Sequence, residues 1–288
     1  MKKKFLLNIC FLACFLFLLI SYGCASKKHI IHKIDDYHLI WSDEFNIDGI
    51  PNQNNWDYEL GFVRNQEEQW YQKNNAFCKD GNLIIEAKKE VKKNPVFTSY
   101  DDKNWRKNRD SIKITSSCLI TKGKHSWQYG RFEMRAKIPT GKGMWPAFWT
   151  LGLESNWPAN GEIDIMEYYK GEILANIAWE SEKKWTPVWD SETVKLSNFK
   201  EDWANQFHLW RMDWDENSIK LFVDNQLIND VDLTTTYNGT NNKNPFHQPH
   251  YLLINLAVGG MNGGDLTKDS LPAEFLIDYI RVYQKKQN

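Results

Sequence analysis

The sequence predicts an all-β fold, a β-sandwich, and three features of its residue pattern point to it. Short segments in which apolar and polar residues alternate recur from residue 39 onward. Turn-forming pairs such as Asp80-Gly81 and Asp224-Asn225 separate these segments, and no long stretch has a helical period. Many short strands joined by recurrent turns are typical of sandwiches.

The expected strands differ in how strongly the pattern marks them. Residues 130–138 alternate over nine positions, and residues 251–258 are almost continuously apolar, which suits a central strand. A hairpin is expected across the turn at residues 215–217. The strands predicted in this way are residues 82–87, 130–138, 210–214, 219–223, 251–258 and 275–283.

Two polar stretches interrupt this series and are expected to form long loops. Residues 90–111 are charged and polar, and residues 234–248 are rich in Thr and Asn. The chain shows no internal repeat and no sign of a second domain. One domain is therefore expected to span residues 39–288.

Three carboxylates stand within six residues of an otherwise apolar strand pattern, at Glu162, Asp164 and Glu167. Buried carboxylates are costly, and two close together shift one another's pKa. Glu162 and Asp164 share a strand face, whereas Glu167 joins them only if a β-bulge near Ile165-Met166 adds a residue. Two glutamates on one face suit retaining glycoside hydrolysis, which needs carboxyl groups roughly 5–5.5 Å apart.

The same carboxylates could instead be the solvated face of an amphipathic edge strand. The flanking sequence argues against this, because Trp145, Trp149 and Trp157 precede the strand and Tyr168-Tyr169 follows it. Aromatic rings stack on the apolar faces of pyranose rings, and clefts that bind sugars use them for this purpose. The aromatic flanks favour a catalytic role for the carboxylates.

These segments resemble family 16 of the glycoside hydrolases, which has an E-I-D-x-x-E motif with a bulge, preceded by W-P-A-x-W. The resemblance covers nearly the whole chain after residue 40 and is strongest to the bacterial laminarinase and mixed-linkage β-glucanase branch. Further matching segments are residues 41–46, 80–83, 129–133 and 277–284. The resemblance implies a curved β-sandwich jelly roll of the concanavalin type, with a substrate cleft on its concave face.

The resemblance also implies a role for each carboxylate. Glu162 corresponds to the nucleophile and Glu167 to the acid/base, whose pKa must lie above that of Glu162. Asp164 is expected to hydrogen-bond Glu162 and tune its charge, although a purely structural carboxylate is the alternative. No cofactor is expected for catalysis.

Candidate sugar-binding residues lie on several segments, and for each the alternative is a place in the core or at the rim. Trp145 and Trp149 fall on one face of a strand, and Asn176 and Trp179 occupy a segment where many laminarinases carry histidines. A lone histidine such as His208 is more often structural. The predicted binding residues are Asn65, Glu68, Tyr71, Trp145, Trp149, Trp157, Asn176, Trp179, His208 and Asn262.

A structural calcium ion is a further implication of the resemblance. The positions that match its ligands are Glu44, Gly81 through its carbonyl, and Asp278. Oxygen ligands fit calcium. The alternative is that Asp278 is an ordinary surface carboxylate.

Composition narrows the partners and substrates. The formal net charge is −1 and no basic stripe stands out, which argues against nucleic acid. The 14 tryptophans exceed what a core of this size needs.

An endo-acting retaining hydrolase of β-glucans with β-1,3 bonds is expected, acting on laminarin, on mixed-linkage β-1,3/1,4-glucan or on both. The protein is expected to be a monomer. A hydrolase of agar or carrageenan and a non-catalytic glucan-binding lectin are the alternatives.

The N-terminus has the pattern of a bacterial lipoprotein signal over residues 1–23. A basic start precedes an apolar run that is short for a membrane span, and Cys24 follows a small residue at the expected cleavage point. Lipid on Cys24 and a polar spacer up to residue 38 would anchor the domain at the outer membrane, on either face. Cys78 and Cys118 would then remain, either paired or as buried apolar residues.

Overall fold

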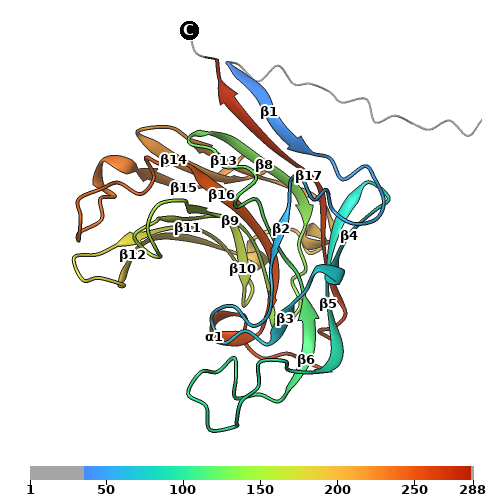
Figure 1. Ribbon diagram of the computed structural model, residues 1–288. Coiled ribbons are helices and arrows are strands. Elements are labelled where there is room, and N and C mark those ends of the chain that lie inside the picture. Colours follow the sequence, from blue (N-terminus) through green and yellow to red (C-terminus); the bar gives the residue numbers. More distant parts are fainter. Residues whose placement is uncertain (1–35, 287–288) are drawn as a thin grey trace, which may run out of the picture. The chain divides into compact units, whose positions relative to one another are not determined.

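Two curved β-sheets lie face to face and contain most of the regular structure (Figure 1). The structure is a computed structural model, and it describes residues 36–286. The larger sheet has ten strands, β1 (Tyr37–Asp43), β3 (Gln69–Tyr71), β4 (Ala76–Lys79), β5 (Asn82–Lys93), β6 (Ser111–Ser116), β8 (Gly130–Lys137), β13 (His208–Trp214), β14 (Ser218–Val223), β15 (Gln226–Asp232) and β17 (Ala273–Lys285). The smaller sheet has seven strands, β2 (Asp57–Glu59), β7 (Cys118–Ile120), β9 (Met144–Gly152), β10 (Glu162–Tyr169), β11 (Glu172–Glu180), β12 (Pro187–Lys195) and β16 (His250–Val258).

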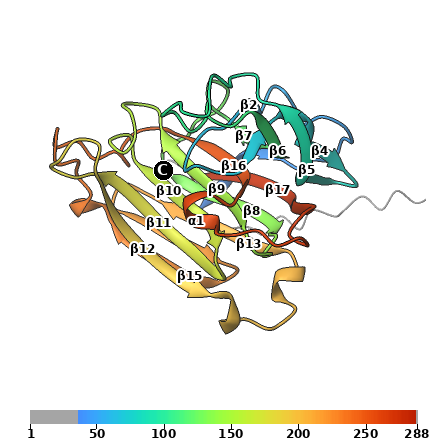
Figure 2. The same ribbon diagram turned by 90° about the horizontal axis from the view of Figure 1, so that it is seen from below.

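The smaller sheet forms the inner layer of the curve, in the order β12-β11-β10-β9-β16-β7-β2 (Figure 2). Its strands pair antiparallel, so residues far apart in sequence meet in rows across the sheet. β10, which carries the three carboxylates, lies between β9 and β11 near the middle of this layer. The all-β fold and the concave cleft face predicted from the sequence are confirmed.

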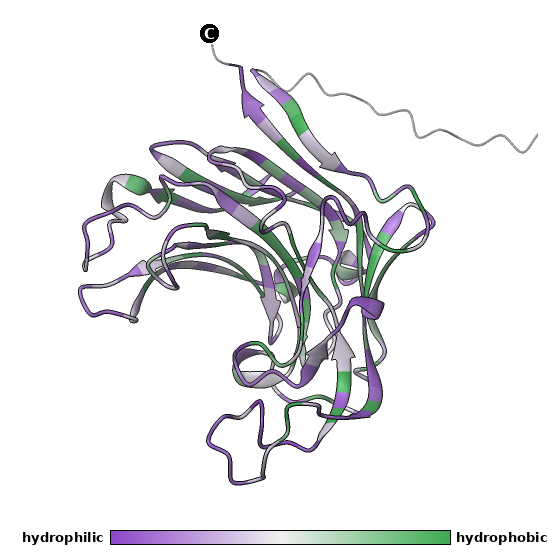
Figure 3. Ribbon diagram, in the orientation of Figure 1, coloured by the Kyte–Doolittle hydropathy of each residue, from purple (hydrophilic) through white to green (hydrophobic). Residues whose placement is uncertain are grey.

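The hydrophobic core fills the space between the two sheets. Phe132, Met134 and Ala136 alternate on β8 and belong to the same buried cluster as Ile163 and Met166 of β10. Figure 3 shows that most hydrophobic residues lie in the strands, whereas the loops are mainly hydrophilic. Because the core takes one face of each strand of the inner sheet, the other face is left for the cleft.

The predicted strands are present with small shifts at their ends. The hairpin of residues 210–214 and 219–223 is the β13–β14 pair, and the central strand of residues 251–258 is β16, which pairs with β9 and β7. The loop predicted from residue 90 begins later, because β5 continues to Lys93. β12 was not among the predicted strands.

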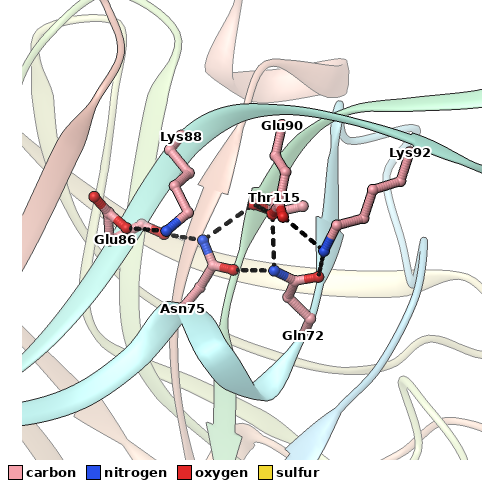
Figure 4. A network of polar contacts seen from close by, with 7 residues as sticks. All are labelled: Gln72, Asn75, Glu86, Lys88, Glu90, Lys92 and Thr115. Carbon is pink, nitrogen blue, oxygen red and sulfur yellow. Dashed lines mark hydrogen bonds and ion pairs between the residues drawn. The ribbon is translucent and has the colours of Figure 1, made fainter.

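A network of polar side chains explains why β5 continues through a charged sequence (Figure 4). Gln72 Nε2 and Thr115 Oγ1 both donate to Glu90 Oε2, at 3.0 and 2.8 Å. Lys92 Nζ lies 2.7 Å from Glu90 Oε1. Side chains beside β5 therefore form hydrogen bonds and an ion pair with polar residues that the apolar pattern alone would place in a loop.

The helices are short, and none in the described range 36–286 is long and apolar enough to cross a membrane. They are η1 (Lys73–Asn75), η2 (Leu196–Asn198), η3 (Trp203–Asn205), η4 (Leu233–Thr235) and α1 (Gly260–Gly263). Cys78 and Cys118 are both buried and free, which decides between the two alternatives for this pair. The predicted signal and Cys24 lie outside the described residues, and β1 begins at Tyr37.

Candidate active site

The bulge predicted on the carboxylate strand is present. On the β11 side the register of β10 shifts between Asp164 and Glu167, and on the β9 side it shifts between Asp164 and Met166. Ile165 and Met166 both enter the inter-sheet core as a result. Glu162, Asp164 and Glu167 all face the cleft, which a regular strand would not allow.

The cleft has a volume of about 760 Å³ on the concave face of the smaller sheet. Rows of paired residues build its floor, such as Trp149, Asp164, Asn176 and Ser191 across four neighbouring strands. The lining consists of Arg64, Asn65, Trp145, Trp149, Leu151, Trp157, Glu162, Asp164, Glu167, Tyr169, Glu172, Leu174, Asn176, Trp189, Ser191, Thr193 and Asn262.

Glu167 is held by two donors from neighbouring strands. Trp145 Nε1 donates to its Oε1 at 2.7 Å, and Asn176 Nδ2 donates to its Oε2 at 3.0 Å. Burial raises the pKa of Glu167 to about 7, and the nearby charge of Glu162 adds to the rise. A carboxyl with this pKa keeps its proton near neutral pH, as a general acid must.

Glu162 lies in a different environment on the same strand. Burial raises its pKa, but a hydrogen bond from Trp157 Nε1 and the positive charge of Arg64 both oppose the rise. Glu162 therefore has two partners that favour its charged form, a hydrogen-bond donor and a guanidinium.

Asp164 lies between the two glutamates, and its pKa is raised well above the usual value. Burial is the main cause, and the charges of Glu162 and Glu167 add to it. A hydrogen bond between Asp164 and Glu162 raises the pKa of Asp164 and lowers that of Glu162. Asp164 is thus suited to keep its proton and donate a hydrogen bond to the Glu162 carboxylate, which agrees with its predicted tuning role.

Arg64, a residue that the sequence analysis did not name, brings the positive charge to this lining. Its guanidinium pairs with Glu59 and lies 5.0 Å from the ring centroid of Trp149. Trp149 Nε1 in turn donates to Asn255 Oδ1 at 2.8 Å. Arg64 directly precedes the predicted Asn65, so its segment was already a candidate for sugar binding. The sequence alone does not show that the side chain of Arg64 points into the cleft.

The glycine-rich loop at α1 brings Asn262 next to Asn65, from segments almost 200 residues apart. Met261 N donates to Asn65 O at 2.9 Å. Gly260 has a φ of +67°, and a Cβ there would lie 2.7 Å from Asn65 O. Glycine at this position therefore allows the close backbone contact that places both asparagines in the cleft.

Two predictions from the Asn65 segment are wrong in detail. Tyr71 is fully buried on β3, where no sugar reaches it. Glu68 lies in a neighbouring hollow with Met261, 3.8 Å from Arg109, and is not part of the cleft lining. The positive φ angles of Asn65 and Gln66 turn the chain here, so residues after the turn point elsewhere.

Trp179 and His208 also lie away from the cleft. Trp179 packs against the inter-sheet core, because it stands three residues from Asn176 on a regular strand and so faces the opposite side. His208 is on β13 of the other sheet. Its ring stacks on that of Trp203, with the ring centroids 3.7 Å apart, and its Nδ1 lies 2.9 Å from Asp224 Oδ2. His208 is therefore structural, as the alternative proposed.

The other six predicted binding residues line the cleft. They are Asn65, Trp145, Trp149, Trp157, Asn176 and Asn262. Trp189, Ser191 and Thr193 of β12 line it too and were not predicted. Their spacing of two is the signal that could have revealed them, since alternate residues of a strand share a face.

The positions matched to calcium ligands do not form a free donor set. Arg281 donates to both carboxylate oxygens of Glu44 at 2.8 Å, and Arg135 Nη1 donates to Asp278 Oδ2 at 2.6 Å. Gly81 lies in the turn between β4 and β5. Over residues 36–286 no group of three or more His, Cys, Asp or Glu side chains is arranged to hold a metal. A structural calcium stays a prediction.

A concave cleft with aromatic walls and two glutamates on one bulged strand, one of them with a pKa raised to about 7, defines a glycoside hydrolase. Comparison with known proteins gives the family. Residues 63–281 match the family model described as glycosyl hydrolases family 16. The chain belongs to this family.

Three similar proteins illustrate the range of the resemblance. A β-glucanase from Rhodothermus marinus is 34% identical over 269 residues, which is 88% of this chain and 87% of that protein. A chain solved for work on endo-acting O-glycanases, which prominent human gut bacteria express to initiate mucin breakdown, is 35% identical with a TM-score of 0.79, covering 88% of this chain and 92% of that one. A non-specific endo-β-1,3(4)-glucanase of family 16, crystallised with a glucan oligosaccharide, is 32% identical with a TM-score of 0.73, covering 87% and 96%.

Proposed function

We propose that the protein is an endo-acting, retaining glycoside hydrolase that cleaves β-glucans containing β-1,3 bonds. The observation that carries the proposal is the bulge of β10, which turns Glu162 and Glu167 to the same face of an aromatic cleft. Because the bulge puts both glutamates on one face of the same strand, their carboxyl groups lie close together, as retaining enzymes require.

The first step uses the difference between the two glutamates. Glu162 attacks the anomeric carbon as its electron pair forms a bond to the sugar, and the glycosidic bond breaks toward the leaving oxygen. Glu167 gives its proton to that oxygen at the same time. Trp157 and Asp164 hold the Glu162 carboxylate by hydrogen bonds, so that it is oriented before the substrate arrives.

The second step reverses the proton transfer. Glu167, now a carboxylate, takes a proton from a water molecule, which attacks the anomeric carbon and releases Glu162. Asn176 donates to Glu167 in this state through Nδ2. Its Oδ1 is buried and has no hydrogen-bond partner among the described residues. Two displacements at one carbon retain its configuration.

A neutral β-glucan suits the charges and openness of the cleft. The guanidinium of Arg64 is already paired with Glu59, so it is a poor partner for the sulfate groups of carrageenan. The similarity to the Rhodothermus marinus β-glucanase and to the endo-β-1,3(4)-glucanase supports both laminarin and mixed-linkage glucan as substrates.

Product analysis tests this function. We expect internal cleavage of laminarin and barley β-glucan, with a broad mixture of oligosaccharides at early times and a first product of β configuration by NMR. Cellulose is the matched glucan without β-1,3 bonds and should stay intact. Binding without release of reducing ends would instead indicate a lectin, and a first product of α configuration would exclude the retaining mechanism.

A second candidate function rests on one comparison. The chain solved for work on mucin-degrading O-glycanases has a TM-score of 0.79, against 0.73 for the endo-β-1,3(4)-glucanase. Mucin O-glycans, agar and carrageenan therefore belong in the same digestion series. Release of oligosaccharides from mucin but not from laminarin would replace the β-glucan assignment while keeping the catalytic residues.

We also propose that lipid on Cys24 anchors the domain, as a monomer, to the outer membrane. The N-terminal sequence supports this proposal, because a basic start and an apolar run precede a cysteine at the expected cleavage point. The protein should sediment with membranes and enter the detergent phase on phase separation, and Cys24→Ala should release it. A wild-type protein found entirely in the soluble fraction would contradict the anchor.

A further inference from the structure

Trp189 is a large aromatic residue without a structural role in the sandwich. It is 44% exposed, although it lies in a strand, and it is outside both clusters of buried hydrophobic residues. Its side chain lines the catalytic cleft. An exposed indole at a concave site is the feature that sugar rings use for stacking.

The strand register places Trp189 in line with the Glu162 nucleophile. Glu162 pairs with Ala178 of β11, and Ala178 pairs with Trp189 of β12. At the usual strand spacing, Trp189 therefore lies roughly 10 Å from Glu162 along the sheet. Ala178 carries only a methyl group, so the intervening residue of β11 places no long side chain of its own between the nucleophile and the indole.

The strand that carries Trp189 is an edge strand, but it is fixed in position. β12 pairs with β11 over nine consecutive residues without a register shift. From the core side, Asn229 Nδ2 donates to Asp190 Oδ1 at 2.9 Å and to Ala175 O at 3.0 Å, which links β15 of the larger sheet to β12 and β11. An aromatic platform on β12 is thus held rigidly beside the catalytic strand.

We infer that Trp189 is the stacking platform of a remote sugar subsite in the β12 half of the cleft. Ser191 and Thr193, which line the cleft on the same strand face, provide hydroxyl groups for the edge of the same chain of sugars. The occupant is a residue of the β-linked polysaccharide that lies a short distance along the chain from the scissile bond. This inference rests on the proposed glycosidase function and assigns the length requirement of its substrate.

Binding of oligosaccharides of increasing length to the Glu162→Gln protein tests this subsite. Addition of Trp189→Ala should weaken binding of the longer oligosaccharides about tenfold or more, because stacking and apolar burial are lost. Binding of the disaccharide should stay unchanged, since it does not need to reach β12. Trp189→Phe should recover part of the affinity, which separates stacking from a general change in the strand.

Trp185→Ala is the matched control. Trp185 is 56% exposed on the hairpin that leads into β12, and it is outside the cleft lining. This control should leave binding at every length unchanged. Equal affinity of the Trp189→Ala protein and its parent for the longest oligosaccharide, with unchanged melting temperatures, would overturn the inference.

The design also separates this inference from the function on which it rests. The oligosaccharides are taken from whichever polysaccharide the wild-type protein cleaves, β-glucan or mucin-type. Failure on β-glucan would remove the proposed substrate, and the length dependence at Trp189 would then be measured on the other glycan. A uniform loss at every length would also count against a remote subsite.

Discussion

Glu162→Gln is expected to reduce turnover of the polysaccharide by about 10⁴-fold or more while binding is retained. The variant removes the nucleophile, and without it the covalent intermediate does not form. The amide oxygen of the new glutamine still accepts the hydrogen bond from Trp157, so the shape of the site is kept. Release of reducing ends and calorimetric binding to oligosaccharides measure the two effects separately.

A control and a chemical rescue make this test specific. Glu192→Gln removes an exposed carboxylate of β12 outside the cleft lining and should keep full activity. In Glu162→Ala, azide can occupy the vacated space and attack an activated aryl glycoside from the nucleophile's face, which gives an α-glycosyl azide. Full activity of Glu162→Gln, or a β-glycosyl azide from Glu162→Ala, would show that Glu162 is not the nucleophile.

Glu167→Gln is expected to have the second large effect, and it should depend on the leaving group. Turnover of polysaccharide should fall by about 10³-fold or more, because the glycosidic oxygen leaves without a proton. Activated aryl glycosides need no such proton, so their glycosylation should be far less affected. In Glu167→Ala, where the side chain leaves room for azide, azide should give a β-glycosyl azide. Equal losses with both kinds of substrate would contradict an acid/base role for Glu167.

The same variant changes the pH dependence in a defined direction. In the wild type, kcat/KM should decline above about pH 7, since Glu167 must be protonated and burial raises its pKa to about 7. Glu167→Gln should lack this basic limb.

Stability should follow the same titration. The pKa of Glu167 is higher in the folded protein than in the unfolded chain, so its proton contributes to the free energy of unfolding. This contribution is fully present below about pH 4.5 and is lost as the pH rises through 7. The variant should therefore gain melting temperature relative to wild type at pH 8.5 but not at pH 4. An equal shift at both values would contradict a buried, raised Glu167.

The sequence by itself determined the all-β fold, the carboxylate strand and most of the aromatic lining. These features depend on local periodicity, and periodicity is a property of the chain alone. Trp145 and Trp149 stand four residues apart on one strand, so their common face followed from counting. The bulge could also be inferred, because only an extra residue near Ile165-Met166 brings Glu167 to the face of Glu162 and Asp164.

Only the tertiary structure decided which residues meet across the cleft. The sheet register aligns Glu162 with Trp189 through Ala178, and the backbone contact at Gly260 brings Asn262 to Asn65. Tyr71 and His208 lie away from the cleft because burial depends on what packs against a strand, which composition does not specify. Counting residues from Asn176, by contrast, already places Trp179 on the opposite face. The surroundings of Glu162 and Glu167 also depend on the tertiary structure, since Arg64, Trp157 and Trp145 reach them from separate segments of the chain.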